Sequence, residues 1–261
     1  MFAQLDTKSV YSFMDSVVDL NTYVKRAKEL GYQSIGLMDR DNLYAAYHFA
    51  QLAIRNGLRP LIGTEANLFY EGRKIPFRLL AKNNQGYKNL IKLATELSSG
   101  QREFTYFSDY LNDIALILPS EDWEPGMSLG SEVFIGVRPE DAGKEFDYPV
   151  VPLHTVRYFE NADRSTIQTL HAISQNVSLS EVSICPMNQL LFSAKEMEEA
   201  YSKLPEALNN LNQLVSDVSY QFDTNLKLPR FNREMPAVDQ LRQLAQSGLA
   251  VSYTHLRAHE T

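Results

Sequence analysis

The sequence predicts an α/β fold, and two observations lead to this prediction. Over residues 1–100, short apolar runs alternate with segments whose apolar side chains recur at helical spacing. Further apolar strands follow as far as residue 154, and helical patterns dominate after residue 161. Because strands separated by helices of this length are typical of βαβ units, we expect a mainly parallel sheet with its chemistry at the carboxyl ends of the strands.

The predicted strands are short apolar runs that end in polar or loop residues. In chain order they cover residues 2–5, 34–38, 59–70, 75–82, 113–119, 132–137 and 148–154. The run at 34–38, SIGLM, has the composition of a strand buried on both faces.

The predicted helices carry apolar residues three or four positions apart. They cover residues 19–31, 41–57, 83–100, 161–174, 193–204, 205–218 and 238–249. In the second helix the spacing places Leu43, Ala46, Tyr47, Ala50 and Ile54 on one face. Glycines end the first two helices, as is common at helix C-termini.

Composition restricts the function classes. The chain has 261 residues, a net charge of −7 and one cysteine, Cys185. The net negative charge argues against a protein that binds nucleic acid through an overall positive charge. A single thiol forms no internal disulfide, so Cys185 is interpreted as structural. The N-terminus lacks an export signal and no apolar run approaches ~18 residues, so we expect a cytoplasmic protein without a membrane partner.

The C-terminal part has two distinctive segments. LKLPRFNREMPAVD, residues 226–239, contains two prolines and is the best linker candidate. SYTHLRAHET, residues 252–261, continues no pattern and is interpreted as a non-native tail. We therefore exclude its His255 and His259 from any site, and we expect His48 and His171 to be core-edge or surface residues.

Six segments together resemble a known family. They are YSFMDS, MDRDNLYAAYHF, RPLIGTEANLF, LLAKNNQGYKNLIKL, HTVRYF and PEALNNLNQL, in this order. The set is similar to the N-terminal polymerase-and-histidinol-phosphatase (PHP) domain of bacterial DNA polymerase III alpha subunits, over about residues 1–250. The resemblance implies a PHP domain at 1–225 and, at 226–251, a link and first helix toward a polymerase core, before the tail at 252–261.

The resemblance also implies a fold and a site. PHP domains are distorted (β/α) barrels of seven strands, here with a helical C-terminal part. Active members hold two or three divalent metals with histidines and carboxylates at the carboxyl ends of the strands.

At the corresponding positions, this chain departs from the family pattern. Carboxylates remain at Asp6, Asp15, Asp39 and Glu65. Five other positions carry residues that are not expected to bind a metal: Lys8, Arg40, Pro76, Thr155 and Arg157. A charged amine or guanidinium offers no lone pair, and Pro76 and Thr155 stand where the family has ligands. His154 lies one residue from an expected ligand and is a weak substitute.

We therefore predict a degenerate metal site without bound metal or catalytic residues. Carboxylates gathered without a cation repel one another, so Lys8, Arg40 and Arg157 could replace the metals in a salt-bridge network. The alternative is that these charges are ordinary solvated surface residues.

The resemblance implies a function for the parent chain. A DNA polymerase would transfer nucleotides with paired aspartates and Mg²⁺ in a palm domain, which this chain lacks. The fragment would then need no cofactor and would support the rest of the polymerase chain. DNA would be bound through the parent, and other replisome subunits are further candidate partners. Two alternatives remain: an active metal-dependent phosphoesterase or 3′–5′ proofreading exonuclease, and a binding module without an enzymatic parent.

Overall fold

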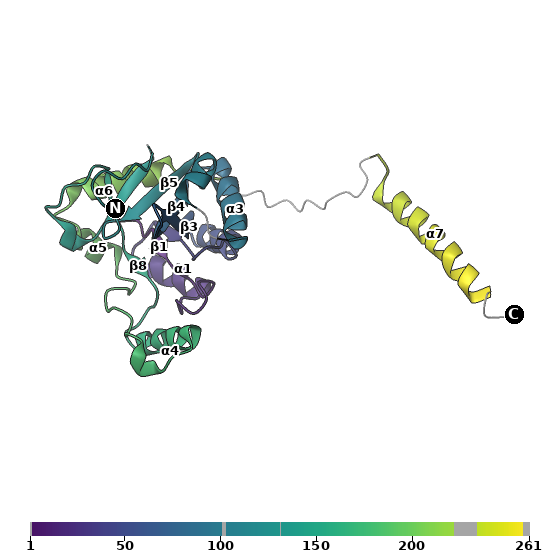
Figure 1. Cartoon of the computed structure of the whole chain (residues 1–261), viewed down its shortest axis with the longest axis horizontal. Coiled ribbons are helices and arrows are strands. Elements are labelled where there is room, and N and C mark those ends of the chain that lie inside the picture. The colour runs from purple at the N-terminus through teal and green to yellow at the C-terminus, as the bar shows by residue number, and fades with distance from the viewer. Residues whose placement is uncertain (1, 101–102, 131, 222–233, 258–261) are drawn as a thin grey trace. The chain divides into compact units, whose positions relative to one another are not determined.

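The computed structural model describes residues 2–100, 103–130, 132–221 and 234–257. Figure 1 labels the main elements, which form two units, 1–221 and 222–261, each described by itself below. The strands are β1 (Asp6–Thr7), β2 (Ser34–Leu37), β3 (Arg59–Tyr70), β4 (Arg73–Ala81), β5 (Ile114–Pro119), β6 (Val133–Val137), β7 (Val150–Pro152) and β8 (Thr155–Val156). The α-helices are α1 (Leu20–Glu29), α2 (Ala46–Arg55), α3 (Asn84–Ser98), α4 (Asp163–Gln175), α5 (Ala194–Ala200), α6 (Pro205–Asp217) and α7 (Ala237–Arg257). Short 3₁₀ helices cover Phe104–Tyr110, Pro139–Asp141 and Leu179–Glu181.

The α/β prediction is confirmed. Six strands form a curled half-barrel sheet in the order β2-β3-β4-β5-β6-β7, and β1 pairs with β8. All ladders are parallel except the two that involve β4. Backbone hydrogen bonds from Gly36 N to Gln4 O (2.6 Å) and from Met38 N to Thr7 O (2.9 Å) connect the β1 segment to β2.

The antiparallel position of β4 follows from a tight hairpin. Glu71 and Gly72 connect β3 to β4, and both have positive φ values, 50° and 77°. Two-residue turns of this kind match the twist of paired antiparallel strands. The hairpin places Glu65 directly opposite Arg78 in the ladder.

Helix α2 differs from its prediction in both start and orientation. It begins at Ala46, because Asp41 takes a φ of 54° and its carboxylate accepts hydrogen bonds from Asn67 at 3.0 and 3.1 Å. The buried face contains Phe49 and Ala53 in addition to Ala46 and Ala50. Tyr47 and Ile54, which the spacing placed on the same face as Ala46 and Ala50, are exposed.

Two predicted strands also have different limits. The expected strand at 2–5 forms its ladder at Asp6–Thr7, with Gln4 in a separate bridge to Ile35. The expected strand at 148–154 is observed as the shorter β7, and β8 follows it after a break at Leu153 and His154. The break separates the strand that continues the large sheet from the strand that pairs with β1.

The predicted helical C-terminal part contains α4, α5 and α6 in the first unit. Helix α4 lies away from the large sheet, at the lower edge of Figure 1. Cys185 is buried with Tyr158 and Ile167 in a small apolar cluster beside it, and burial raises the pKa of the thiol.

In the second unit, the helix expected at 238–249 is observed as the longer α7. The predicted linker at 226–239 lies largely outside the described residues, as does the end of the predicted tail, 258–261. In the described part of the chain, no helix combines the length and apolar character needed to cross a membrane.

Gly36 is required by the close approach of β1 to β2. A Cβ atom at this position would lie 2.0 Å from Leu5 O, which is backbone and cannot rotate away. We expect Gly36→Ala to lower the free energy of unfolding by about 1–3 kcal/mol, measured by urea denaturation, because one element must shift. Gly248→Ala is the control, since a Cβ there meets nothing within 4 Å. Equal unfolding midpoints for Gly36→Ala and the unsubstituted protein would contradict this packing.

Candidate functional site

The candidate site is a cluster of charged side chains at the carboxyl ends of β1 and β2. Residues two apart on a strand face the same side, so Asp6 and Lys8 point together into the molecule. The β3–β4 pairing brings Glu65 and Arg78 to the same place. The charged cluster comprises Asp6, Lys8, Asp15, Arg40, Glu65, Arg78 and Arg157.

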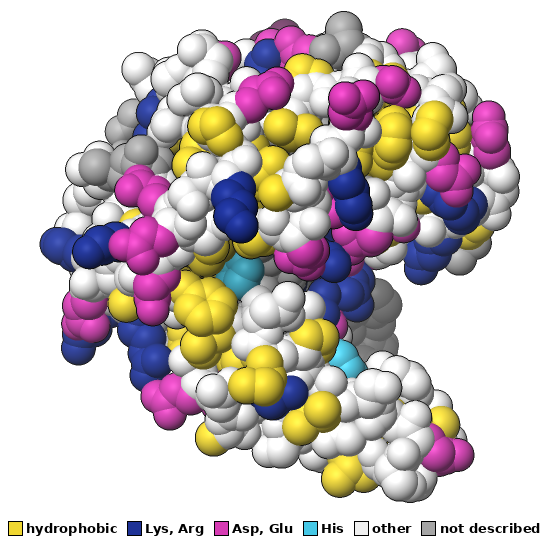
Figure 2. Space-filling model, turned by 90° about the vertical axis from the view of Figure 1, so that its left-hand side faces the viewer, with side chains coloured by type: hydrophobic (Ala, Val, Ile, Leu, Met, Phe, Trp, Pro, Cys, Tyr) yellow, Lys and Arg dark blue, Asp and Glu magenta, His cyan; other side chains and the backbone are white. Residues whose placement is uncertain are grey.

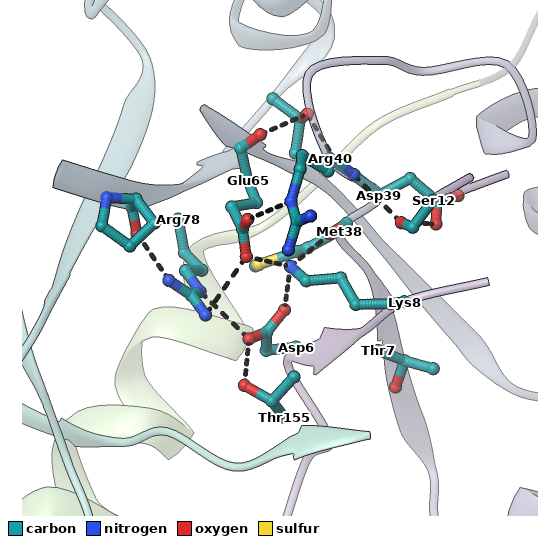
Figure 3. A network of polar contacts seen from close by, with 12 residues as sticks. Asp6, Thr7, Lys8, Ser12, Met38, Asp39, Arg40, Glu65, Arg78 and Thr155 are labelled. Carbon is teal, nitrogen blue, oxygen red and sulfur yellow. Dashed lines mark hydrogen bonds and ion pairs between the residues drawn. The ribbon is translucent and has the colours of Figure 1, made fainter. Parts of the chain in front are cut away.

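Lys8 is the centre of the cluster (Figure 3). Its side chain is fully buried, and Nζ lies 2.6 Å from Asp6 Oδ1 and 3.0 Å from Glu65 Oε2. Nζ also donates to Met38 O at 2.6 Å. An ammonium group has three N–H donors, so these three acceptors satisfy it completely.

Arg78 supports the same two carboxylates from the opposite side (Figure 3). Its Nε lies 3.0 Å from Asp6 Oδ2, its Nη2 lies 3.2 Å from Glu65 Oε2, and its Nη1 donates to Pro76 O at 2.5 Å. Thr155 Oγ1 donates to Asp6 Oδ2 at 2.6 Å. Asp6 therefore has a charged or hydroxyl partner on each oxygen, which compensates for its burial.

Arg40 extends the cluster outward to Asp15. Its Nε lies 2.8 Å from Glu65 Oε1, and its Nη2 lies 2.8 Å from Asp15 Oδ2. Asp15 also receives Arg157 Nη2 at 3.4 Å and His171 Nε2 at 3.1 Å. The loop that carries Asp15 is thus connected to β3 through one guanidinium.

Asp39 has partners of another kind. Its carboxylate accepts from Ser9 N at 2.6 Å, Ser9 Oγ at 2.7 Å and Ser12 Oγ at 2.7 Å. We expected Asp39 to surround the cations with the other carboxylates, whereas neutral donors from the loop after β1 hold it.

The electrostatics of the cluster favour the charged forms. Burial alone would raise the pKa of the Asp6 and Glu65 carboxyls, because it penalises the charged form. Lys8 and Arg78 outweigh burial, so the pKa of each carboxyl lies below its ordinary value. Burial would conversely lower the pKa of Arg78, but Asp6 and Glu65 raise it overall.

The remaining predicted positions have smaller roles. Pro76 contributes its backbone oxygen to Arg78 and no side-chain ligand. His154 bonds through Nε2 to Leu190 O at 2.8 Å and packs against Phe192, with ring centroids 5.6 Å apart. Burial lowers the pKa of its imidazole. Its side-chain contacts therefore lie outside the charged cluster.

The donor set does not fit the metals that the PHP family implies. Lys8 Nζ is between Asp6 and Glu65, where a shared divalent ion would need to bind, and arginines contact both carboxylates as well. Among the described residues, no group of three or more His, Cys, Asp or Glu side chains is arranged to hold a metal ion. The geometry is that of a network of buried ion pairs among Asp6, Lys8, Glu65 and Arg78, which connects the strand ends. We call this network the ionic lock.

A cavity of about 610 Å³ adjoins the cluster. Arg78, His154 and Thr155 contribute to its wall, together with the apolar side chains of Phe192 and Tyr201. Figure 2 shows that one face of the molecule is hollowed and that hydrophobic, charged and histidine side chains gather there.

Sequence reasoning missed Arg78 and His171 as members of the site. Arg78 is a charged residue inside the apolar strand IPFRLLA, two positions after Pro76 and so on the same face. This pattern could have identified it. His171 comes from α4, and only the tertiary fold brings it to Asp15.

The buried position of Lys8 leads to a stability prediction. We expect Lys8→Met to lower the free energy of unfolding by about 3–5 kcal/mol, because it leaves buried carboxylates with less compensating charge. The control is Arg73→Met, which removes an exposed ion pair with Glu124 and should cost less than about 1 kcal/mol. Urea denaturation measures both. Similar losses for the two variants would argue against a buried ionic lock.

The lowered carboxyl pKa values lead to a pH prediction. A carboxyl whose pKa is lower in the folded state contributes stability above its unfolded pKa, about 4, and loses it as the pH falls through the folded pKa. The free energy of unfolding should therefore decrease steadily below about pH 5. Lys8→Met should flatten this decrease, since Asp6 and Glu65 would titrate closer to their unfolded values. An equally steep decrease in the variant would contradict the assignment.

The chain resembles known proteins along most of its length. The family model for the PHP domain matches residues 4–124. DNA polymerase III subunit alpha of Streptococcus pyogenes serotype M1 is 45% identical over 252 residues, which are 95% of this chain and 24% of that protein. The same subunit of Halalkalibacterium halodurans is 25% identical over 284 residues, covering 94% of this chain and 25% of that protein. The chain thus spans about a quarter of the length of these relatives.

Similarity to solved structures is weaker. An amidohydrolase from Chromobacterium violaceum superimposes with a TM-score of 0.31 and 18% identity, covering 37% of this chain and 33% of that protein. A score this low does not bear on the fold. By its sequence the chain contains a PHP domain, matched at residues 4–124, and along 95% of its length it is similar to the N-terminal region of DNA polymerase III alpha subunits.

Proposed function

We propose that this chain is the N-terminal part of a replicative DNA polymerase and that its PHP domain is catalytically inactive, metal-free and structural. One observation carries the second half of the proposal: Lys8 Nζ lies within 3.0 Å of both Asp6 and Glu65. A buried ammonium here supplies the positive charge that metals supply in active family members. The site is a degenerate metal site used as an ionic lock.

The proposed role in the parent follows from the relatives. They are named as DNA polymerase III alpha subunits and are about four times as long as the matched region. Nucleotide transfer, with its Mg²⁺, would belong to a palm domain elsewhere in the parent chain. The partners of this region are then the rest of the polymerase chain, DNA through the parent, and other replisome subunits.

The finer fold that we propose is the seven-stranded barrel of the PHP family. If β7 and β8 are counted as one bent strand, the strands number seven in chain order. The β1–β8 ladder and the hydrogen bonds between the β1 segment and β2 support closure of that barrel. The charged cluster would then lie at the carboxyl end of the barrel, where its ion pairs join β1, β3 and β4.

The structural role follows from what the cluster connects. Lys8, which follows β1, and Arg78, on β4, share the carboxylates of Asp6, on β1, and Glu65, on β3. A buried network of this kind loses its compensation when any single member is removed, so it holds the strand ends in one arrangement.

The competing function is a metal-dependent phosphoesterase, and metal binding separates the two. After exposure to Zn²⁺ and Mn²⁺ followed by dialysis, elemental analysis should find well under one metal per chain. The melting temperature should be the same with and without EDTA, because a ligand of the native state would raise it. Two or three tightly bound metals per chain, with a melting temperature lowered by EDTA, would contradict the proposal and favour the phosphoesterase.

A further inference from the structure

Two loops at the carboxyl ends of β1 and β2 expose an unusual number of large apolar side chains. Phe13 and Tyr44 are 70% and 72% exposed, which is more than for any other aromatic residue among the exposed hydrophobics of the described chain. We name this surface the aromatic platform; it comprises Val10, Tyr11, Phe13, Met14 and Tyr44 of the two loops and Tyr47 of the first turn of α2. Exposed apolar side chains gathered in this way mark interaction surfaces, whereas isolated ones do not.

Hydrogen bonds join the two loops into one surface. Asn42 Nδ2 donates to Tyr11 O at 3.0 Å, and Arg40 N donates to Ser12 Oγ at 3.1 Å. Asn42 Oδ1 in turn accepts from Tyr44 N at 3.1 Å. Asn42 therefore holds the loop that carries Phe13 against the segment that carries Tyr44.

Buried polar contacts next to the charged cluster hold the loop that carries Phe13 in place. Met14 adopts a φ of 61°, a left-handed conformation that is costly for a side chain with a Cβ atom. The next residue, Asp15, is anchored by Arg40 at 2.8 Å, and Ser12 is anchored by Asp39 at 2.7 Å. A loop held in this way loses little further freedom when it binds, which favours association.

Charge and composition indicate a protein partner. Aromatic residues, methionine and arginine are enriched in protein interfaces. Nucleic acid would require uncompensated positive charge. Segments 10–16 and 40–47 contain one cation, Arg40, and its guanidinium is already paired with Asp15 and Glu65. Stacking of single-stranded DNA on the aromatic rings is therefore disfavoured.

The size of the platform indicates a partner in the same polypeptide. An independent partner usually needs about 20–30 residues on each side, and the platform has six. A covalent connection supplies a high effective concentration, so a contact within one chain can be small. The relatives have about three quarters of their length outside the matched region.

We infer that the aromatic platform docks the polymerase region that follows this domain in the full-length chain. The inference rests on the proposed function, because it requires a parent polymerase. It adds the surface through which the PHP domain supports that polymerase, and it gives the charged cluster a purpose: the cluster holds the docking loops.

Site-specific photocrosslinking in the full-length polymerase tests this inference. p-Benzoylphenylalanine is placed in turn at Phe13 and at Tyr44, the chain is irradiated, and crosslinked peptides are mapped by mass spectrometry. The control position is Ile54, which is 55% exposed on α2 outside the two loops. We expect both platform positions to form crosslinks within the chain to peptides that follow residue 251 in the full-length polymerase, several-fold more often than position 54.

Three outcomes would overturn the inference. They are crosslinks mainly to primer–template DNA, crosslinks mainly to another protein or a second copy of the chain, and platform yields no higher than those from position 54. Isotope-labelled and unlabelled chains, mixed before irradiation, distinguish contacts within a chain from contacts between copies. Metal analysis of the unsubstituted polymerase tests the proposed function separately, so a failure of docking and a failure of the metal-free role can be distinguished.

Discussion

The structure depends on a buried ammonium group that is shared by two carboxylates. Lys8 lies at the carboxyl end of β1, and its burial would be prohibitive without Asp6 and Glu65. The converse also holds, since these two carboxylates could not stay ionised in the interior without cations. Because the ammonium and the two carboxylates compensate one another, the strand ends that carry them must lie together. Arg78 adds β4 to these ion pairs, and Arg40 adds the loop after β2.

This arrangement links the interior of the domain to its surface. The ion pair between Arg40 and Asp15 and the serine contacts of Asp39 shape the loop after β1, which exposes Phe13. The family resemblance implies that metal-binding relatives carry out catalysis at the carboxyl ends of these strands. In this chain, Lys8, Arg40 and Arg78 contact the carboxylates there, and we propose that this end of the sheet has become a docking surface.

The order and type of most elements could be predicted because their apolar periods are clear. The sequence also identified Asp6, Lys8, Glu65 and Arg40, since the family resemblance marks these positions. What could not be predicted depended on local geometry. The hairpin at Glu71 and Gly72 reversed β4. Asp41 takes a positive φ before α2, which begins later than its apolar spacing predicts. Arg78 and His171 join the cluster through strand pairing and long-range packing, which periodicity does not reveal.

A double-mutant cycle between Lys8 and Glu65 tests the central claim most directly. Lys8→Met, Glu65→Gln and the double variant are unfolded in urea at pH 7, and the coupling energy is obtained from the three losses in free energy of unfolding. We predict a favourable coupling of about 0.5–3 kcal/mol, as expected for residues that share one buried network. Additive losses, with a coupling near zero, would show that the two charges contribute independently and that no ionic lock exists.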